Sequence, residues 1–200
     1  MNTTYAWKVI LLGSLSFIIS AQACKWLDQN QEKQTRQILH TFNQMVLAEE
    51  RQICQKDTSH LCVIDSLCIT RSPLGISCGS FQVESAAIAV REVADQTIQF
   101  YRRNQKRLDY HQPAWERLQE LVHYQNQQLS DCIPKGGENQ LFIQVISKRF
   151  NTLQRFLENQ EDEVCAQRTA HAKIRRILLM ASQLSSCMKK RHLESSLTQL

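Results

Sequence analysis

The chain of 200 residues has only five glycines and three prolines, while 42% of its residues are hydrophobic. This composition suits a compact domain with a true hydrophobic core. Almost no segment alternates apolar and polar residues as a half-buried strand does, so we expect an all-α fold. The chain also lacks an H-E-x-x-H motif and a glycine-rich phosphate loop, and we do not expect an enzyme.

A single long apolar run lies near the N-terminus. Residues 9–19 follow Lys8, and Ala21-Gln22-Ala23 has the small residues of a cleavage site. The run is too short for a membrane anchor, because a helix needs about 20 apolar residues to cross the hydrocarbon core. We therefore expect residues 1–23 to be a signal peptide and residues 24–200 to form a single secreted helical domain.

The chain contains eight cysteines. Secretion would place them in an oxidising environment, where disulfides form. The four cysteines between residues 54 and 78 are separated by seven, five and nine residues, which does not match the paired C-x-x-C spacing of a zinc site. We therefore expect disulfides, and neither a metal site nor a cofactor.

The formal net charge is +5, from 24 lysines and arginines against 19 aspartates and glutamates. These charges are spread along the whole chain, as on solvated helix faces, so we expect no binding to nucleic acid and no insertion into a membrane. The densest basic cluster is Lys189-Lys190-Arg191. We expect it at the C-terminus of the last helix, where cations stabilise the helix.

Five segments have apolar residues at intervals of three and four, the spacing of a helix with one buried face. The third follows Pro113, which suits the first turn of a helix, and stops before the breaker Pro134-Lys-Gly-Gly137. Residues 51–80 form a connection that is unusually long for a compact domain. The expected helices span residues 24–50, 82–104, 114–132, 138–160 and 163–191.

Each segment is expected to bury one apolar stripe. The first segment differs from the others, because its middle, residues 30–37, is entirely polar. Five helices with one long early connection fit a bundle, although the apolar pattern alone leaves other helical topologies open. The residues expected to face inward include Ile38, Phe42, Val90, Val93, Trp115, Leu118, Leu141, Phe150, Phe156, Ile174 and Leu178.

The most specific pattern is Phe150-Asn-Thr-Leu-Gln-Arg-Phe-Leu157, followed by seven residues and Cys165-Ala166. It resembles the signature of type I interferons, in which an aromatic-Leu pair precedes seven residues and Cys-Ala-Trp. Gln167 stands here in place of that tryptophan. The resemblance implies an all-α helical-cytokine bundle of five helices with a long loop after the first helix.

Further similarities to type I interferons occur in the family's order. Cys24 is at the expected mature N-terminus, and Cys54-Gln-Lys-Asp57 looks like the start of the family's long loop. Gln112-Pro-Ala-Trp115, with Cys132 further on, is similar to the opening and the end of the family's third helix. The resemblance therefore extends over nearly the whole mature chain, although residues 62–80 have no recognisable counterpart.

The family's two disulfides carry over by resemblance. Its N-terminal cysteine pairs with the one that ends the third helix, which implies Cys24 to Cys132. Its loop cysteine pairs with the one that opens the last helix, which implies Cys54 to Cys165. Each bridge would close a loop of about 100 residues, for which chain entropy gives about 4 to 5 kcal/mol. Four cysteines remain, with three possible connectivities, and we favour a bridge within the loop, with Cys187 tied to that loop: Cys62, Cys68, Cys78 and Cys187.

The resemblance implies a secreted cytokine that joins two different cell-surface receptor chains and induces antiviral genes through receptor-associated kinases. One chain would engage the long loop and the last helix, and the other a face built by the second, third and fourth helices. The heterodimeric type I interferon receptor is thus the expected partner, and the cytokine is expected to be a monomer. The positions that match the family's contacts with the first chain are Lys56, Asp57, His171, Ala172, Arg175, Arg176 and Leu179.

Other functions stay open at this point. Another helical cytokine, such as a type III interferon or a member of the interleukin-ten class, would share the bundle but has different cysteine positions. A membrane-active basic protein is suggested by residues 173–180. A bundle that needs Ile177 and Leu178 in its core leaves that segment no free apolar face. A nucleophilic pair of Cys165 and His171 is not expected, because their spacing puts them on different sides of one helix.

Overall fold

The structure, a computed structural model, describes residues 30–46, 83–130, 133 and 140–197. These residues form five helices and no strand, which confirms the all-α prediction. We refer to the first of them, residues 30–45, as the N-terminal helix. None of the helices described is long and apolar enough to cross a membrane. The other four are α3 (Val83–Arg103), α4 (Gln112–Ser130), α5 (Gln140–Asn159) and α6 (Glu163–Leu197).

The described helix boundaries agree with the expected ones to within a few residues, with two exceptions, while the expected start of the first helix at Cys24 lies outside the described residues. The N-terminal helix ends at residue 45, before the expected Glu50, because the chain bends at Val46. Helix α6 continues to Leu197 and not to Arg191. No glycine or proline follows Arg191 to end the helix. The basic residues 189–191 therefore lie inside α6, and their expected place at its C-terminus is wrong.

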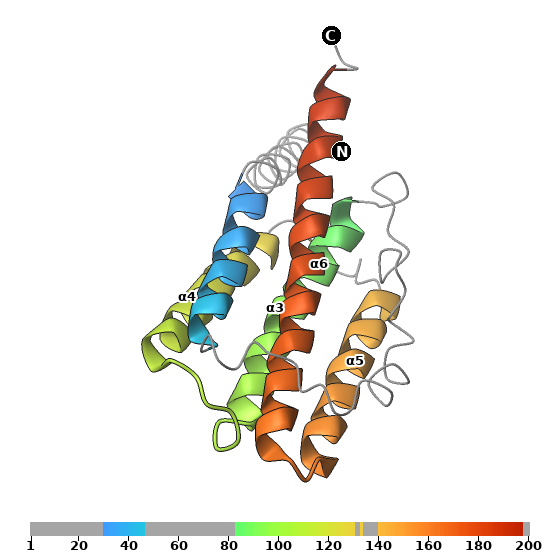
Figure 1. The fold of residues 1–200 in the computed structure, drawn as a ribbon. Coiled ribbons are helices and arrows are strands. Elements are labelled where there is room, and N and C mark those ends of the chain that lie inside the picture. Colours follow the sequence, from blue (N-terminus) through green and yellow to red (C-terminus); the bar gives the residue numbers. More distant parts are fainter. Residues whose placement is uncertain (1–29, 47–82, 131–132, 134–139, 198–200) are drawn as a thin grey trace, which may run out of the picture.

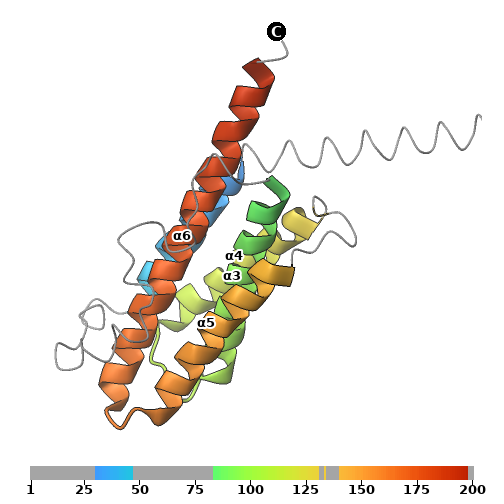
Figure 2. The same cartoon turned by 90° about the vertical axis from the view of Figure 1, so that its right-hand side faces the viewer.

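Helix α3 lies at the centre of the bundle and packs against α4, α5 and α6 (Figure 1). The N-terminal helix runs beside α4 and α6, and a hydrogen bond of 2.9 Å from the amide of His111 to the carbonyl of Met45 joins its end to the start of α4. The C-terminal end of α6 extends beyond the other described helices (Figure 2). Side-chain contacts between the N-terminal helix and α6 extend from Glu32 to Asn43, so these two helices share one long contact.

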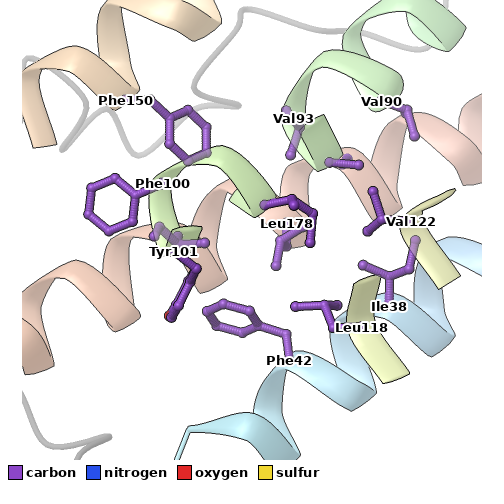
Figure 3. Close-up of a cluster of buried hydrophobic side chains, with 14 of the residues drawn as sticks. Ile38, Phe42, Val90, Val93, Phe100, Tyr101, Leu118, Val122, Phe150 and Leu178 are labelled. Atoms are coloured by element: carbon purple, nitrogen blue, oxygen red, sulfur yellow. The ribbon is translucent and has the colours of Figure 1, made fainter. Parts of the chain in front are cut away.

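One continuous hydrophobic cluster joins all the described helices (Figure 3). The N-terminal helix contributes Phe42, α3 contributes Tyr101, and α6 contributes Leu178, each almost fully buried. Phe156 is only partly buried but packs against the cluster. Of the inward-facing residues named above, all except Leu141 are therefore confirmed.

Leu141 is 64% exposed, so its expected place in the core is wrong. The stripe that α5 buries includes Ile146 and Phe150. Leu141 is five residues before Ile146, which is a rotation of about 140° around an α-helix. The residue therefore points away from the core, although it is apolar and lies at the edge of a helical pattern.

The polar middle of the N-terminal helix is buried. Thr35 Oγ1 lies 2.8 Å from Ser185 Oγ of α6 and accepts a hydrogen bond of 2.9 Å from Gln125 Nε2 of α4. Gln31 Nε2 donates to the same oxygen at 3.1 Å, and Gln34 Nε2 donates to the carbonyl of Leu121 at 3.3 Å. Hydrogen bonds thus replace apolar contact where three helices meet.

Candidate functional site

The N-terminal helix and α6 meet along an antiparallel seam. At one end of the seam, Ser186 Oγ and Lys189 Nζ both donate to the carboxylate of Glu32, each at 3.1 Å. At the other end, Arg175 Nε donates to Asn43 Oδ1 at 2.8 Å. Residue numbers rise along one helix while they fall along the other. The two helices are therefore antiparallel and stay in contact from Glu32 to Asn43.

Three of the expected contact residues lie on the surface beside this seam. Arg175 and Arg176 are exposed, and Leu179 is 36% exposed. Ala172, one turn before Arg176, is half-buried at the edge of this group. The bond to Asn43 restrains Arg175, so less side-chain freedom would be lost when it contacts another molecule. We call Arg175, Arg176 and Leu179 the α6 patch.

His171 does not belong to the α6 patch. It is 2% exposed, and its Nδ1 lies 2.6 Å from Tyr101 Oη of α3. The five positions expected to form the stripe on α6 span about 140° around the helix, and His171 is at the edge of that arc nearest the core. Burial disfavours the charged ring and lowers its pKa to about 4. The placement of His171 on a contact surface is therefore corrected to a core position.

An aromatic cluster surrounds the hydroxyl-bearing ring of Tyr101. The rings of Phe42, Tyr110, Trp115 and His171 all have centroids between 5.6 and 5.9 Å from that of Tyr101. These distances are typical of stabilising aromatic pairs. The cluster joins the N-terminal helix, α3, α4 and α6, and it confirms that Trp115 is a core residue and not a surface anchor.

Gln167 replaces the tryptophan that completes the interferon signature. Its side chain is buried, and its Nε2 donates to the carbonyl of Asp109 at 3.2 Å. Asp109 belongs to the connection between α3 and α4. The side-chain amide of Gln167 therefore ties α6 to that connection by a hydrogen bond. A tryptophan at this position would stabilise the same contact chiefly by burying its large apolar surface. Trp115 packs on Tyr110 in the same connection, with ring centroids 5.5 Å apart.

The start of α6 is fixed by its acidic flank. Asp162 Oδ1 accepts a hydrogen bond of 2.9 Å from the amide of Cys165, which is the geometry of an N-cap. Cys165 itself is buried. Asp162 therefore caps the N-terminus of α6, where a negative charge is also favoured by the helix dipole.

The proposed cysteine pairings stay predictions. Cys24, Cys54 and Cys132 lie outside the described residues, so neither Cys24 to Cys132 nor Cys54 to Cys165 is tested. Cys187 of α6 is disulfide-bonded. That bond agrees with the expectation that Cys187 takes part in a bridge, and its expected partner in residues 62–78 lies outside the described part of the chain.

Lys56 and Asp57, the two contact residues expected in the long loop, also lie outside the described residues. The same stretch contains Gly75-Ile-Ser-Cys-Gly79, which has the G-x-S-x-G spacing of a serine-hydrolase nucleophile. That spacing has meaning only on a turn between a strand and a helix. The described ranges contain no strand, and within them no three His, Cys, Asp or Glu side chains gather as a metal site would need.

Comparison with protein-family models gives a match to the interferon alpha/beta domain over residues 27–188. The match includes the Phe150 to Ala166 pattern and the α6 patch. No match was found among the curated proteins or among the solved structures. The matched family consists of cytokines and not of enzymes. Since the match extends over most of the sequence and the described helices form the expected bundle, the chain belongs to the interferon alpha/beta family.

Proposed function

We propose that the chain is a secreted type I interferon that binds two different receptor chains at the cell surface and thereby induces antiviral genes through receptor-associated kinases. The observation that carries this proposal is the family match over residues 27–188. The all-α bundle supports it, because cytokines of this kind act by presenting separate helix faces to separate receptors. Residues 1–23 would be removed as a signal peptide, leaving one domain that starts at Cys24 and acts as a monomer.

The α6 patch is proposed to contact the receptor chain that, in this family, engages the long loop and the last helix. Its two arginines are exposed and adjacent, and Leu179 adds an apolar surface one turn further along α6. Arginine in a partly desolvated interface is a frequent hot spot, and its guanidinium suits receptor carboxylates. Ala172 lies at the rim, and Lys56 and Asp57 would complete the contact from the loop.

His171 is given a different role in this proposal. Its ring packs behind the patch against Tyr101, so it holds α6 against α3 and does not touch the receptor. A substitution at His171 would therefore act on binding only through the position of the helix.

The alternatives receive less support. A membrane-active segment at residues 173–180 would need a free apolar face, but Ile174 and Leu178 are buried in the core. The cytokine classes with other cysteine positions are disfavoured by the family match.

The binding test uses mature protein and the soluble ectodomain of each receptor chain, immobilised separately. Replacing both Arg175 and Arg176 by alanine is expected to weaken binding to one chain by about tenfold or more. A matched variant, Lys148→Ala with Arg155→Ala, removes two exposed cations from α5. We expect this control to bind that same chain as the wild type does.

Circular dichroism of both variants separates loss of contact from loss of fold. Equal binding of the wild type and the Arg175 and Arg176 variant to both ectodomains would refute the role of the α6 patch. Absence of binding by the folded wild-type protein to either ectodomain would refute the proposed function itself.

A further inference from the structure

A groove with a volume of about 610 Å³ lies where the N-terminal helix meets α4 and the C-terminal half of α6. Four cationic side chains line it: Lys33, Arg36, Arg117 and Lys189. One carboxylate, Glu32, lines it as well. The cations come from three helices, and Lys33 and Lys189 are 156 residues apart in the sequence. Folding therefore brings together on one surface four cations that come from three separate segments of the sequence.

The cations are accessible to a ligand. The side chains of Arg36, Arg117 and Lys189 are between 47% and 68% exposed, and Lys33 is exposed as well. Exposed charges around a concave surface add their fields, which attracts anions more strongly than the same charges on a convex surface would. Four cations from three helices suit a polymer of repeated anions better than a single small ion, which could pair with only some of them.

The two carboxylates near the groove do not cancel its charge. Glu32 pairs with both Arg36 and Lys189, and the hydrogen bond from Lys189 is the main cause that lowers the pKa of Glu32. Arg117 pairs with Glu120 at 2.9 Å on the exposed surface of α4. Four cations against these two carboxylates still leave two positive charges. The pair of Arg117 with Glu120 is exposed on both sides and therefore weak, so an incoming anion can replace it.

We propose that this groove binds a sulfated polysaccharide. Sulfate groups along a sugar chain would pair with the lysines and arginines, while His40 and Thr41 in the lining can hydrogen-bond to sulfate or hydroxyl oxygens. The preference for a sulfated polysaccharide over a nucleic acid rests on the proposed secretion, because such polymers are found outside cells. No residue of the α6 patch lines the groove, so the two surfaces are separate.

The test measures binding of mature protein to a heparin oligosaccharide at about physiological salt, where weaker electrostatic contacts are already screened. The groove variant replaces Lys33, Arg36 and Arg117 by glutamine and is expected to bind about tenfold more weakly. The charge-matched control replaces Arg102, Arg103 and Lys106, which are exposed and lie outside the groove, by glutamine. We expect that control to bind within about twofold of the wild type.

Two further probes identify the ligand class: the same oligosaccharide after removal of its sulfates, and a single-stranded DNA of similar charge. Strong binding to the sulfated form alone supports the proposal. Equal losses in the groove variant and the control, undiminished binding of the desulfated sugar, or tighter binding to DNA would each overturn it.

If the groove variant does not fold, Lys33→Glu replaces it. This substitution reverses one exposed charge and is expected to weaken heparin binding several-fold, with wild-type affinity as the contradicting result. The measurement contains no receptor, so its outcome is independent of whether the chain signals.

Discussion

At the scale of single residues, burial decides the charge of His171. The ring lies in the core between helices, with Tyr101 as its hydrogen-bond partner and 2% of its surface exposed. A charged imidazole would lose its hydration there, so the neutral form is favoured and the pKa falls to about 4. The same ring in the unfolded chain would protonate near its ordinary pKa of about 6.5.

This difference predicts that acid weakens the fold through His171. Between about pH 6.5 and 4 the unfolded chain binds a proton that the folded chain does not, so the free energy of unfolding falls as the pH falls through this window. The shift from 6.5 to about 4 corresponds to roughly 3 kcal/mol. Chemical denaturation across this pH range would measure the loss.

The matched variant for this prediction is His171→Gln, which keeps a polar side chain beside Tyr101 but does not titrate. The difference in unfolding free energy between the wild type and this variant should change with pH across the window. A constant difference would show that His171 is not the titrating group.

At the scale of elements, each helix is defined by its ends and by the face it buries. Helix α6 starts at Glu163 because Asp162 caps it through the amide of Cys165. The N-terminal helix is held by a polar layer, in which Thr35 bonds to Gln125 and contacts Ser185. Both features rest on hydrogen bonds whose loss leaves a buried or terminal donor without an acceptor.

Removing the cap with Asp162→Ala is expected to lower the free energy of unfolding by about 1 kcal/mol, because the amide of Cys165 loses its acceptor. Glu161→Ala, which removes a neighbouring exposed carboxylate, should change it by less than about 0.5 kcal/mol. Urea denaturation of the two variants and the wild type measures both effects. An equal effect in the two variants would point to charge alone and against the cap.

Breaking the polar layer with Thr35→Val is expected to cost about 1 to 3 kcal/mol, because the buried amide of Gln125 loses its acceptor. Thr152→Val is a matched control: each threonine donates its hydroxyl to the carbonyl four residues earlier at 2.9 Å, but Thr152 lies near the surface of α5. Thermal and urea unfolding would compare them. Equal costs for the two substitutions would contradict a special role for the layer.

The apolar stripes of α3 and α4 could be predicted from the sequence because the helical period is local information. The polar layer could not, since the partners of Thr35 are 90 and 150 residues away. Leu141 shows a related limit, because an apolar residue in the first turn of a helix need not share the angle of the buried stripe. His171 was misplaced because it lies at the edge of the expected α6 arc nearest the core, where the helical spacing alone does not separate a buried residue from an exposed one.

At the scale of the whole molecule, two surfaces lie along the N-terminal helix, one toward each end. Toward its C-terminal end, Asn43 holds Arg175 of the α6 patch. Further toward its N-terminal end, Arg36 gathers with Arg117 of α4 and Lys189 of α6 around the basic groove. The first surface could be proposed from the sequence by family resemblance, since its residues follow Cys165 at fixed spacing. The second depends on residues that only folding brings together.

The function proposed for the chain is signalling as a type I interferon, with the α6 patch as a receptor contact. The most direct measurement is the dose response of an interferon-stimulated reporter in cells that carry the type I receptor and in matched cells that lack one of its chains. We predict a response in the first cells, none in the second, and about a tenfold or greater increase in the dose required by the Arg175→Ala, Arg176→Ala variant. A response that persists without the receptor chain, or no response to folded protein in either cell line, would contradict the account.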